Sequence, residues 1–140
     1  MVEVALILPL FVGLLLAGAD LARAFSVQLA IQNGARAGAE SYAIDQTPTP
    51  AEAAAAAVAE ISRTPGVNGG LANVIVWETD SLGATPCANH PVSGTWTPPS
   101  PANPCYVSVE VQYTFKTTIA WPLIPNTATF DRVTTFRMFY

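Results

Sequence analysis

Few side chains in this 140-residue chain have the types and spacing that enzyme chemistry requires. His90 is the single histidine, and no carboxylate lies within seven residues of it in the sequence. A nucleophile, a base and an orienting group cannot be assigned together. The sequence has no phosphate-binding glycine pattern, and its two cysteines have neither C-x-x-C nor zinc-type spacing. We therefore predict no catalytic residue, no metal site and no cofactor, and a hydrolase that depends on His90 is the least favoured hypothesis.

Glu3 is the charged residue whose position is most informative. It precedes sixteen uncharged and mostly apolar residues, from Val4 to Ala19. A carboxylate surrounded by hydrocarbon or by protein interior needs a cationic partner, and no Lys or Arg is near it in the sequence. The nearest candidate is an α-amino group, that of Met1 or that of a neighbouring chain. The alternative is that Glu3 lies among lipid headgroups.

Cys87 and Cys105 enclose a segment rich in Pro, Ser, Thr and Asn. Such a pair is typical of a disulfide formed outside the cytosol, and the alternative is two free thiols. In the loop-closure model, a disulfide around a loop near this length stabilises the fold by about 3 kcal/mol. Trp96 lies inside the loop. It is predicted to cover the loop or to contact a neighbouring chain, with a carbohydrate or receptor contact as a weaker alternative.

Composition limits the class of protein further. Apolar residues make up 51% of the chain and charged residues 11%, against about 25% charged in average globular proteins. The net charge is −4 and the six basic residues are scattered, so the chain lacks the basic face that nucleic-acid binding requires. The length is enough for one compact domain with an appendage.

The appendage is predicted to be one long helix from Val2 to about Ile44, with Pro9 as its only proline. At 1.5 Å per residue this helix is about 65 Å long. After Asp20 its pattern becomes amphipathic. The predicted buried stripe is Ala24, Val27, Ile31, Ala35, Gly38 and Tyr42, widened by Leu21, Phe25 and Leu29. The predicted polar side is Asp20, Arg23, Gln28, Gln32, Arg36 and Glu40.

Small residues also recur along this helix at four-residue steps: Gly18, Ala22, Ser26, Ala30, Gly34 and Gly38. Such rows let two helix backbones approach closely. For Gly18, Ala22 and Ser26 we favour contact with a helix of another chain. For Ala30 to Gly38, packing on the chain's own globular part is an equally good explanation.

The remaining segments predict a small α+β head. Thr49 as N-cap, Pro50 and Glu52 begin a second helix. Alternating residues predict strands at 73–79 and 105–117, and a Thr-rich strand follows from 127. We therefore predict a lollipop-shaped pilin-like fold, in which 1–45 is a helix that serves as anchor or filament core. A head domain, 46–140, then holds an antiparallel sheet of three to four strands and the disulfide loop 87–105.

The N-terminal stretch "VEVALILPLFVGLLLAGADLARAFSVQLAIQNGARAGAESYA" resembles the TadE-like branch of the tight-adherence pilin system, within the type IV pilin class. The matching features are Glu3 before an apolar run that contains Pro9, the step from Asp20 to Arg23, and the stretch "QNGARAGA". A strand such as "VSVEVQYTF" and an apolar connector with proline are also similar to that family, whereas no correspondence is expected for the loop between Asp80 and Cys105.

The resemblance implies a membrane-held prepilin, cut by a prepilin peptidase and drawn into a filament by an ATPase-driven platform. It implies that Glu3 pairs with a neighbour's N-terminal amine, although this glutamate usually lies slightly deeper in the mature chain. A basic leader is not present in the sequence, so we expect either the processed form or a trimmed start. The assembly residues expected on these grounds are Met1, Glu3, Pro9, Gly18, Ala22 and Ser26.

The favoured functional hypothesis is a structural subunit that polymerises with copies of itself into an extracellular filament for adhesion or surface attachment, after anchoring in the inner membrane. One alternative is a minor pilin or a pseudopilin of a Tad-type or type II-like secretion assembly. A further alternative is a single-pass membrane protein whose outer domain binds a ligand.

Overall fold

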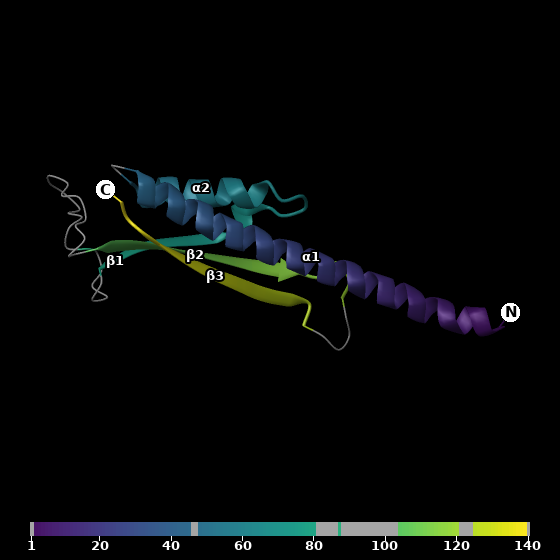
Figure 1. Ribbon diagram of the computed structural model, residues 1–140. Coiled ribbons are helices and arrows are strands. Elements are labelled where there is room, and N and C mark those ends of the chain that lie inside the picture. Colours follow the sequence, from purple (N-terminus) through teal and green to yellow (C-terminus); the bar gives the residue numbers. More distant parts are fainter. Residues whose placement is uncertain (1, 46–47, 81–86, 88–103, 121–124, 140) are drawn as a thin grey trace.

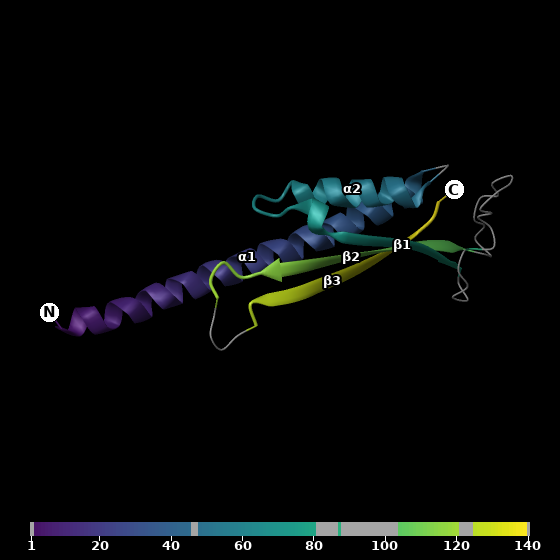
Figure 2. The same cartoon turned by 180° about the vertical axis from the view of Figure 1, so that it is seen from behind.

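The computed structural model describes residues 2–45, 48–80, 87, 104–120 and 125–139. It contains two helices, α1 (Val2–Ile44) and α2 (Pro50–Ser62), and a short 3-10 turn, η1 (Gly69–Leu71). The strands are β1 (Asn73–Asp80), β2 (Cys105–Lys116) and β3 (Thr127–Arg137). The first half of α1 projects beyond the other elements, and the second half lies alongside α2, with both helices packed over the sheet (Figures 1 and 2). The predicted α+β lollipop fold is confirmed.

Helix α1 is continuous through Pro9. Proline has no backbone N–H to donate and its ring crowds the preceding turn, so it removes one hydrogen bond of the ladder, but the helix does not end here. Leu and Ala on both sides of Pro9 are strong helix formers. The 43 residues of α1 span about 65 Å, as predicted.

The second half of α1 carries the core-facing stripe. Val27, Ile31, Ala35 and Tyr42 are buried, as predicted. The prediction that Leu21, Phe25 and Leu29 widen this stripe was wrong, since their exposed fractions are 60%, 59% and 60%. Phe25 and Leu29 are each two residues from Val27, which places them about 200° away around the helix.

Helix α2 begins as its sequence predicts. The Thr49 side chain accepts a hydrogen bond from the Glu52 backbone N–H at 3.3 Å, and Pro50 occupies the first turn. The alanines leave α2 with a flat buried side formed by Ala53, Ala57 and Ile61. This flat side is what allows α2 to pack tightly on another helix.

Two glycines of α1 lie under α2. A Cβ atom added at Gly34 would meet Ile61 Cγ1 at 2.5 Å, and one added at Gly38 would meet the Ala53 carbonyl oxygen at 2.8 Å. The second part of the small-residue row therefore packs on the chain's own head. This outcome decides between the two explanations that the sequence left open for these positions.

The three strands form an antiparallel meander in the order β1-β2-β3. Val109 of β2 pairs with Val76 on one side and with Thr134 on the other. Val107, Val109 and Val111 are fully buried, so the predicted alternation in β2 gives the face that packs under the helices. The last strand begins at Thr127, as predicted, and ends at Arg137, and β1 extends one residue further than predicted, to Asp80.

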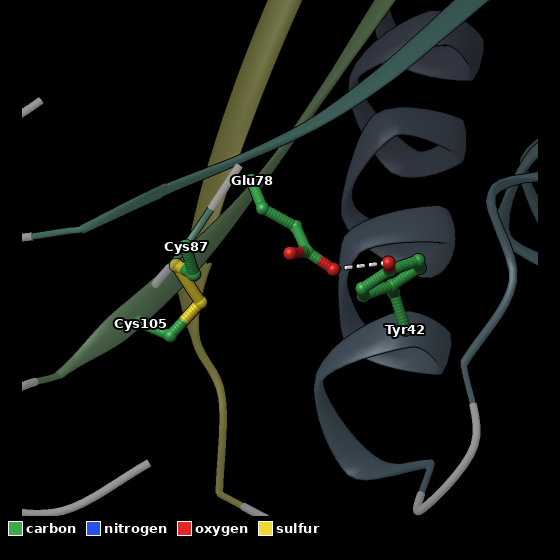
Figure 3. Close-up of a disulfide and its surroundings, with 4 residues drawn as sticks. All are labelled: Tyr42, Glu78, Cys87 and Cys105. Atoms are coloured by element: carbon green, nitrogen blue, oxygen red, sulfur yellow. Dashed lines mark hydrogen bonds between the residues drawn. A yellow bond between two sulfur atoms is a disulfide. The ribbon is translucent and has the colours of Figure 1, made fainter. Parts of the chain in front are cut away.

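The disulfide predicted between Cys87 and Cys105 is present, and both residues are buried. Next to it lies Glu78, whose exposed fraction is 8% and whose Oε1 accepts a hydrogen bond from the Tyr42 hydroxyl (Figure 3). The Glu78 carboxylate and the two sulfurs lie within 4.8 Å of one another. Because both sulfurs are bonded to each other, they are not available as thiolate ligands.

Tyr42 gives a testable pH dependence. Burial, with the hydrogen bond and the charge of Glu78, raises the pKa of Tyr42 well above its usual value of 10.0. The folded state thus keeps a proton that the unfolded state releases above pH 10. The stabilisation that this pKa difference gives to the folded state is fully present below pH 10 and is lost as the pH rises above it. Urea unfolding at pH 8 and pH 11 should show a larger decline for the parent than for Tyr42→Phe; equal declines would contradict this assignment.

Candidate assembly surface

The projecting half of α1 exposes an extensive apolar surface. In the most apolar stretch of 18 residues in this helix, only 6% is buried by the rest of the chain. By its length and composition the helix could cross a membrane. The core helix of a soluble protein would be mostly covered by its own chain. The large apolar residues exposed along this half and just beyond it are Val4, Ile7, Leu8, Leu10, Phe11, Val12, Leu14, Leu15, Leu16, Leu21, Phe25 and Leu29.

Asp20 marks the point where α1 meets the head. Its exposed fraction is 7%, so its placement on the polar side of the helix was wrong. Its Oδ1 accepts a hydrogen bond from the Thr118 backbone N–H at 3.1 Å and lies 3.4 Å from the Arg23 guanidinium. Arg23 also donates to the Thr118 hydroxyl, and its guanidinium lies 5.6 Å from the centre of the Phe115 ring. We call Asp20, Arg23, Phe115 and Thr118 the Asp20 cluster.

The Asp20 cluster predicts unequal effects of two substitutions. Asp20→Ala removes the acceptor of a backbone N–H and should lower the free energy of unfolding by about 1–3 kcal/mol. Asp20→Asn retains a side-chain oxygen for that N–H and should lower it less. Urea unfolding of the two variants in detergent micelles measures the difference. Unchanged stability in Asp20→Ala would show that the cluster does not hold the β2–β3 connector.

The predicted assembly residues that the structure describes lie on α1 between Glu3 and Ser26. Glu3 and Pro9 are in its first turns. Gly18, Ala22 and Ser26 are exposed, and the Ser26 hydroxyl donates to the Ala22 carbonyl at 3.0 Å. This bond satisfies the Ser26 hydroxyl donor within the helix itself. Met1, Trp96 and His90 lie outside the described residues.

Sequence reasoning missed two features of this surface. The exposed residues Leu21, Phe25 and Leu29 extend the apolar surface past Asp20. Their angle from Val27 on a helical wheel would have shown that they lie away from the buried stripe. The contact between Asp20 and Thr118 joins residues 98 positions apart. Nothing in the local pattern indicates that contact.

Comparison with known proteins gives one match. Residues 1–40 match the family model described as TadE-like protein, which covers most of α1 and ends before α2. No curated protein and no solved structure matches the chain. The matched range contains Glu3, the apolar run with Pro9, the Asp20–Arg23 step and the stretch "QNGARAGA", which are the features on which the resemblance was based. Over residues 1–40, which include most of its long helix, the chain is therefore similar to TadE-like proteins.

Proposed function

We propose that this protein is a structural subunit of a Tad-type filament, in which α1 is the part that assembles. The observation that supports this most is the projecting half of α1, where an apolar helix stands free of an otherwise folded head. In water, burying one Val, Ile, Leu or Phe side chain gains about 1.5–3 kcal/mol. A surface of twelve such residues is therefore unstable in water and requires lipid or protein around it.

The exposed apolar surface of α1 suits two environments, lipid before assembly and a bundle of helices after it. Before assembly the apolar run lies in the inner membrane, and afterwards it lies among the equivalent helices of other subunits. Lipid tails are as apolar as leucine, so transfer out of the membrane gains little from the hydrophobic effect. Close packing along Gly18, Ala22 and Ser26 and the pairing of Glu3 with a neighbour's N-terminal amine must then favour assembly. The head faces water and coats the filament, which mediates surface attachment.

The test is filament formation by cells that carry the secretion machinery, with Glu3→Ala as the variant and Glu3→Asp as its control. Filaments should be visible by negative stain for the parent chain. Glu3→Ala should reach the membrane at normal levels and form few filaments, because the amine then has no carboxylate partner. Glu3→Asp keeps the negative charge and should form more filaments than Glu3→Ala. Normal filament yield for Glu3→Ala would refute the pairing.

Two outcomes of the same experiment would favour the other hypotheses. Low copy number in filaments built from another subunit would indicate a minor pilin or a pseudopilin. Detergent-solubilised monomers, with no filaments under any condition, would indicate a single-pass membrane protein with a ligand-binding head. Each hypothesis uses the same anchored helix, so the distinction rests on copy number and polymerisation.

A further inference from the structure

The Asp20 cluster bears on where along α1 the hydrocarbon core of a membrane ends. We propose that one side of a tilted α1 faces lipid past Asp20 to Phe25, and that the opposite side, where Asp20 binds Thr118, meets the inner edge of the headgroup layer, so that the start of the β2–β3 connector, Thr118 to Ala120, lies at this membrane boundary. The occupant of this surface is thus a phospholipid bilayer. This inference rests on the membrane-anchored stage of the proposed function.

The length of the apolar run is the first argument. Val4 to Ala19 is sixteen residues, or about 24 Å of helix, whereas the hydrocarbon core of a bilayer is about 30 Å thick. A run that ends at Asp20 is therefore about 6 Å too short. Val4 to Phe25 is 22 residues and about 33 Å, which matches the hydrocarbon core. The exposed fractions of Leu21 and Phe25, 60% and 59%, leave both side chains available to lipid.

The shielding of Asp20 is the second argument. A carboxylate at this depth would ordinarily set the membrane boundary, because a bare charge in hydrocarbon costs several kcal/mol. Here Asp20 is 7% exposed and is held by the Thr118 backbone N–H and by Arg23. Its charge is thus turned toward the head and away from the lipid-facing side of the helix. The head supplies the polar groups that a membrane cannot.

The position and composition of the connector are the third argument. Both views place the β2–β3 end of the sheet beside the middle of α1, on the side of its N-terminal half (Figures 1 and 2). The sequence from 119 to 125 contains no charged residue, and Ala120 and Pro125 are exposed. Lys116 and Arg23 are exposed and flank this end, and cationic side chains suit the phosphates of the headgroup layer.

The experiment uses the full chain, disulfide intact, reconstituted in phosphatidylcholine liposomes. A fluorophore is attached to single introduced cysteines, because Cys87 and Cys105 are bonded to each other and do not react. The variants are Leu14→Cys, Phe25→Cys, Ala120→Cys and Val133→Cys, all at exposed positions. Lipids brominated near the headgroup or deep in the acyl chain quench probes at matching depth.

The inference predicts loss of emission at Phe25 and Ala120 with shallow bromine, and at Leu14 with deep bromine. Val133, far along β3 from the connector, should keep its emission with both lipids. Unquenched probes at Phe25 or Ala120, with Leu14 still quenched, would overturn the inference and leave the membrane anchor intact. An unquenched probe at Leu14 would instead overturn the anchored stage of the proposed function.

Discussion

Gly38→Leu is expected to unfold the head of this protein. The Cβ atom alone would lie 2.8 Å from the Ala53 carbonyl oxygen and 3.1 Å from the Ala57 Cβ. Both neighbours are backbone or the first atom of a side chain, so neither can move aside by rotating. Overpacking of a closely packed site costs about 1–3 kcal/mol and sometimes more, which is a large part of the stability of a domain of this size.

The same helix offers two comparisons for this prediction. At Gly34 an added Cβ atom would meet Ile61 Cγ1 at 2.5 Å and the Ala57 carbonyl oxygen at 3.0 Å, and Ile61 is fully buried, so Gly34→Leu should destabilise the head to a comparable degree. A Cβ atom at Gly13 meets nothing within 4 Å, and Gly13→Leu should leave the head unchanged. Urea unfolding in detergent micelles, followed by far-UV circular dichroism, gives the three midpoints. A parent-like midpoint for Gly38→Leu would show that α1 and α2 are not as close as described.

Gly34 and Gly38 also show how far the sequence alone can predict the fold. The four-residue row from Gly18 to Gly38 was recognisable, but its partner was not. A four-residue step of about 400° advances slowly around a helix, so one row begins on the outer side at Gly18 and ends under α2 at Gly38. The sequence pattern specifies close packing, whereas only the position of α2 decides which part packs within the chain.

Local signals were predicted well because their causes are local. The capping box at Thr49 and Glu52 and the alternation of Val107, Val109 and Val111 depend on neighbours a few residues away. The disulfide was predictable because two cysteines leave a single possible pair. Each of these features follows from residue type and spacing without knowledge of the rest of the chain.

Buried charges were predicted badly because their partners are distant in sequence. Asp20 was assigned to the solvated side, since an isolated aspartate is usually exposed. Its acceptor role depends on Thr118, which lies just after β2 and 98 positions away in the sequence. Glu78 is likewise buried through its bond to Tyr42, which is 36 residues away on α1. Spacing arguments contain no information about such contacts, and both contacts lie where α1 meets the sheet.

Gly18→Leu is expected to prevent assembly without unfolding the head. A Cβ atom at Gly18 meets nothing within 4 Å in the subunit, so leucine fits the isolated chain. Leucine also favours the helix by up to about 1 kcal/mol over glycine and suits lipid. In the proposed filament, however, Gly18 lies where two helix backbones approach, and the added side chain separates them. Filament yield should fall at least about tenfold, which corresponds to 1.4 kcal/mol per contact.

The matched control for assembly is Gly13→Leu, the same change five residues earlier in α1. Gly13 lies about 140° away from Gly18 around the helix, outside the small-residue row, so this variant should form filaments at near-normal yield. Counting filaments by negative stain, with membrane levels checked by immunoblot, separates the two variants. Equal losses would mean that α1 tolerates no added bulk anywhere, and unchanged yields for both would place the contact elsewhere. Loss at Gly18 alone assigns the row from Gly18 to Ser26 to the neighbour, just as loss of folding at Gly38 assigns the end of the same row to α2.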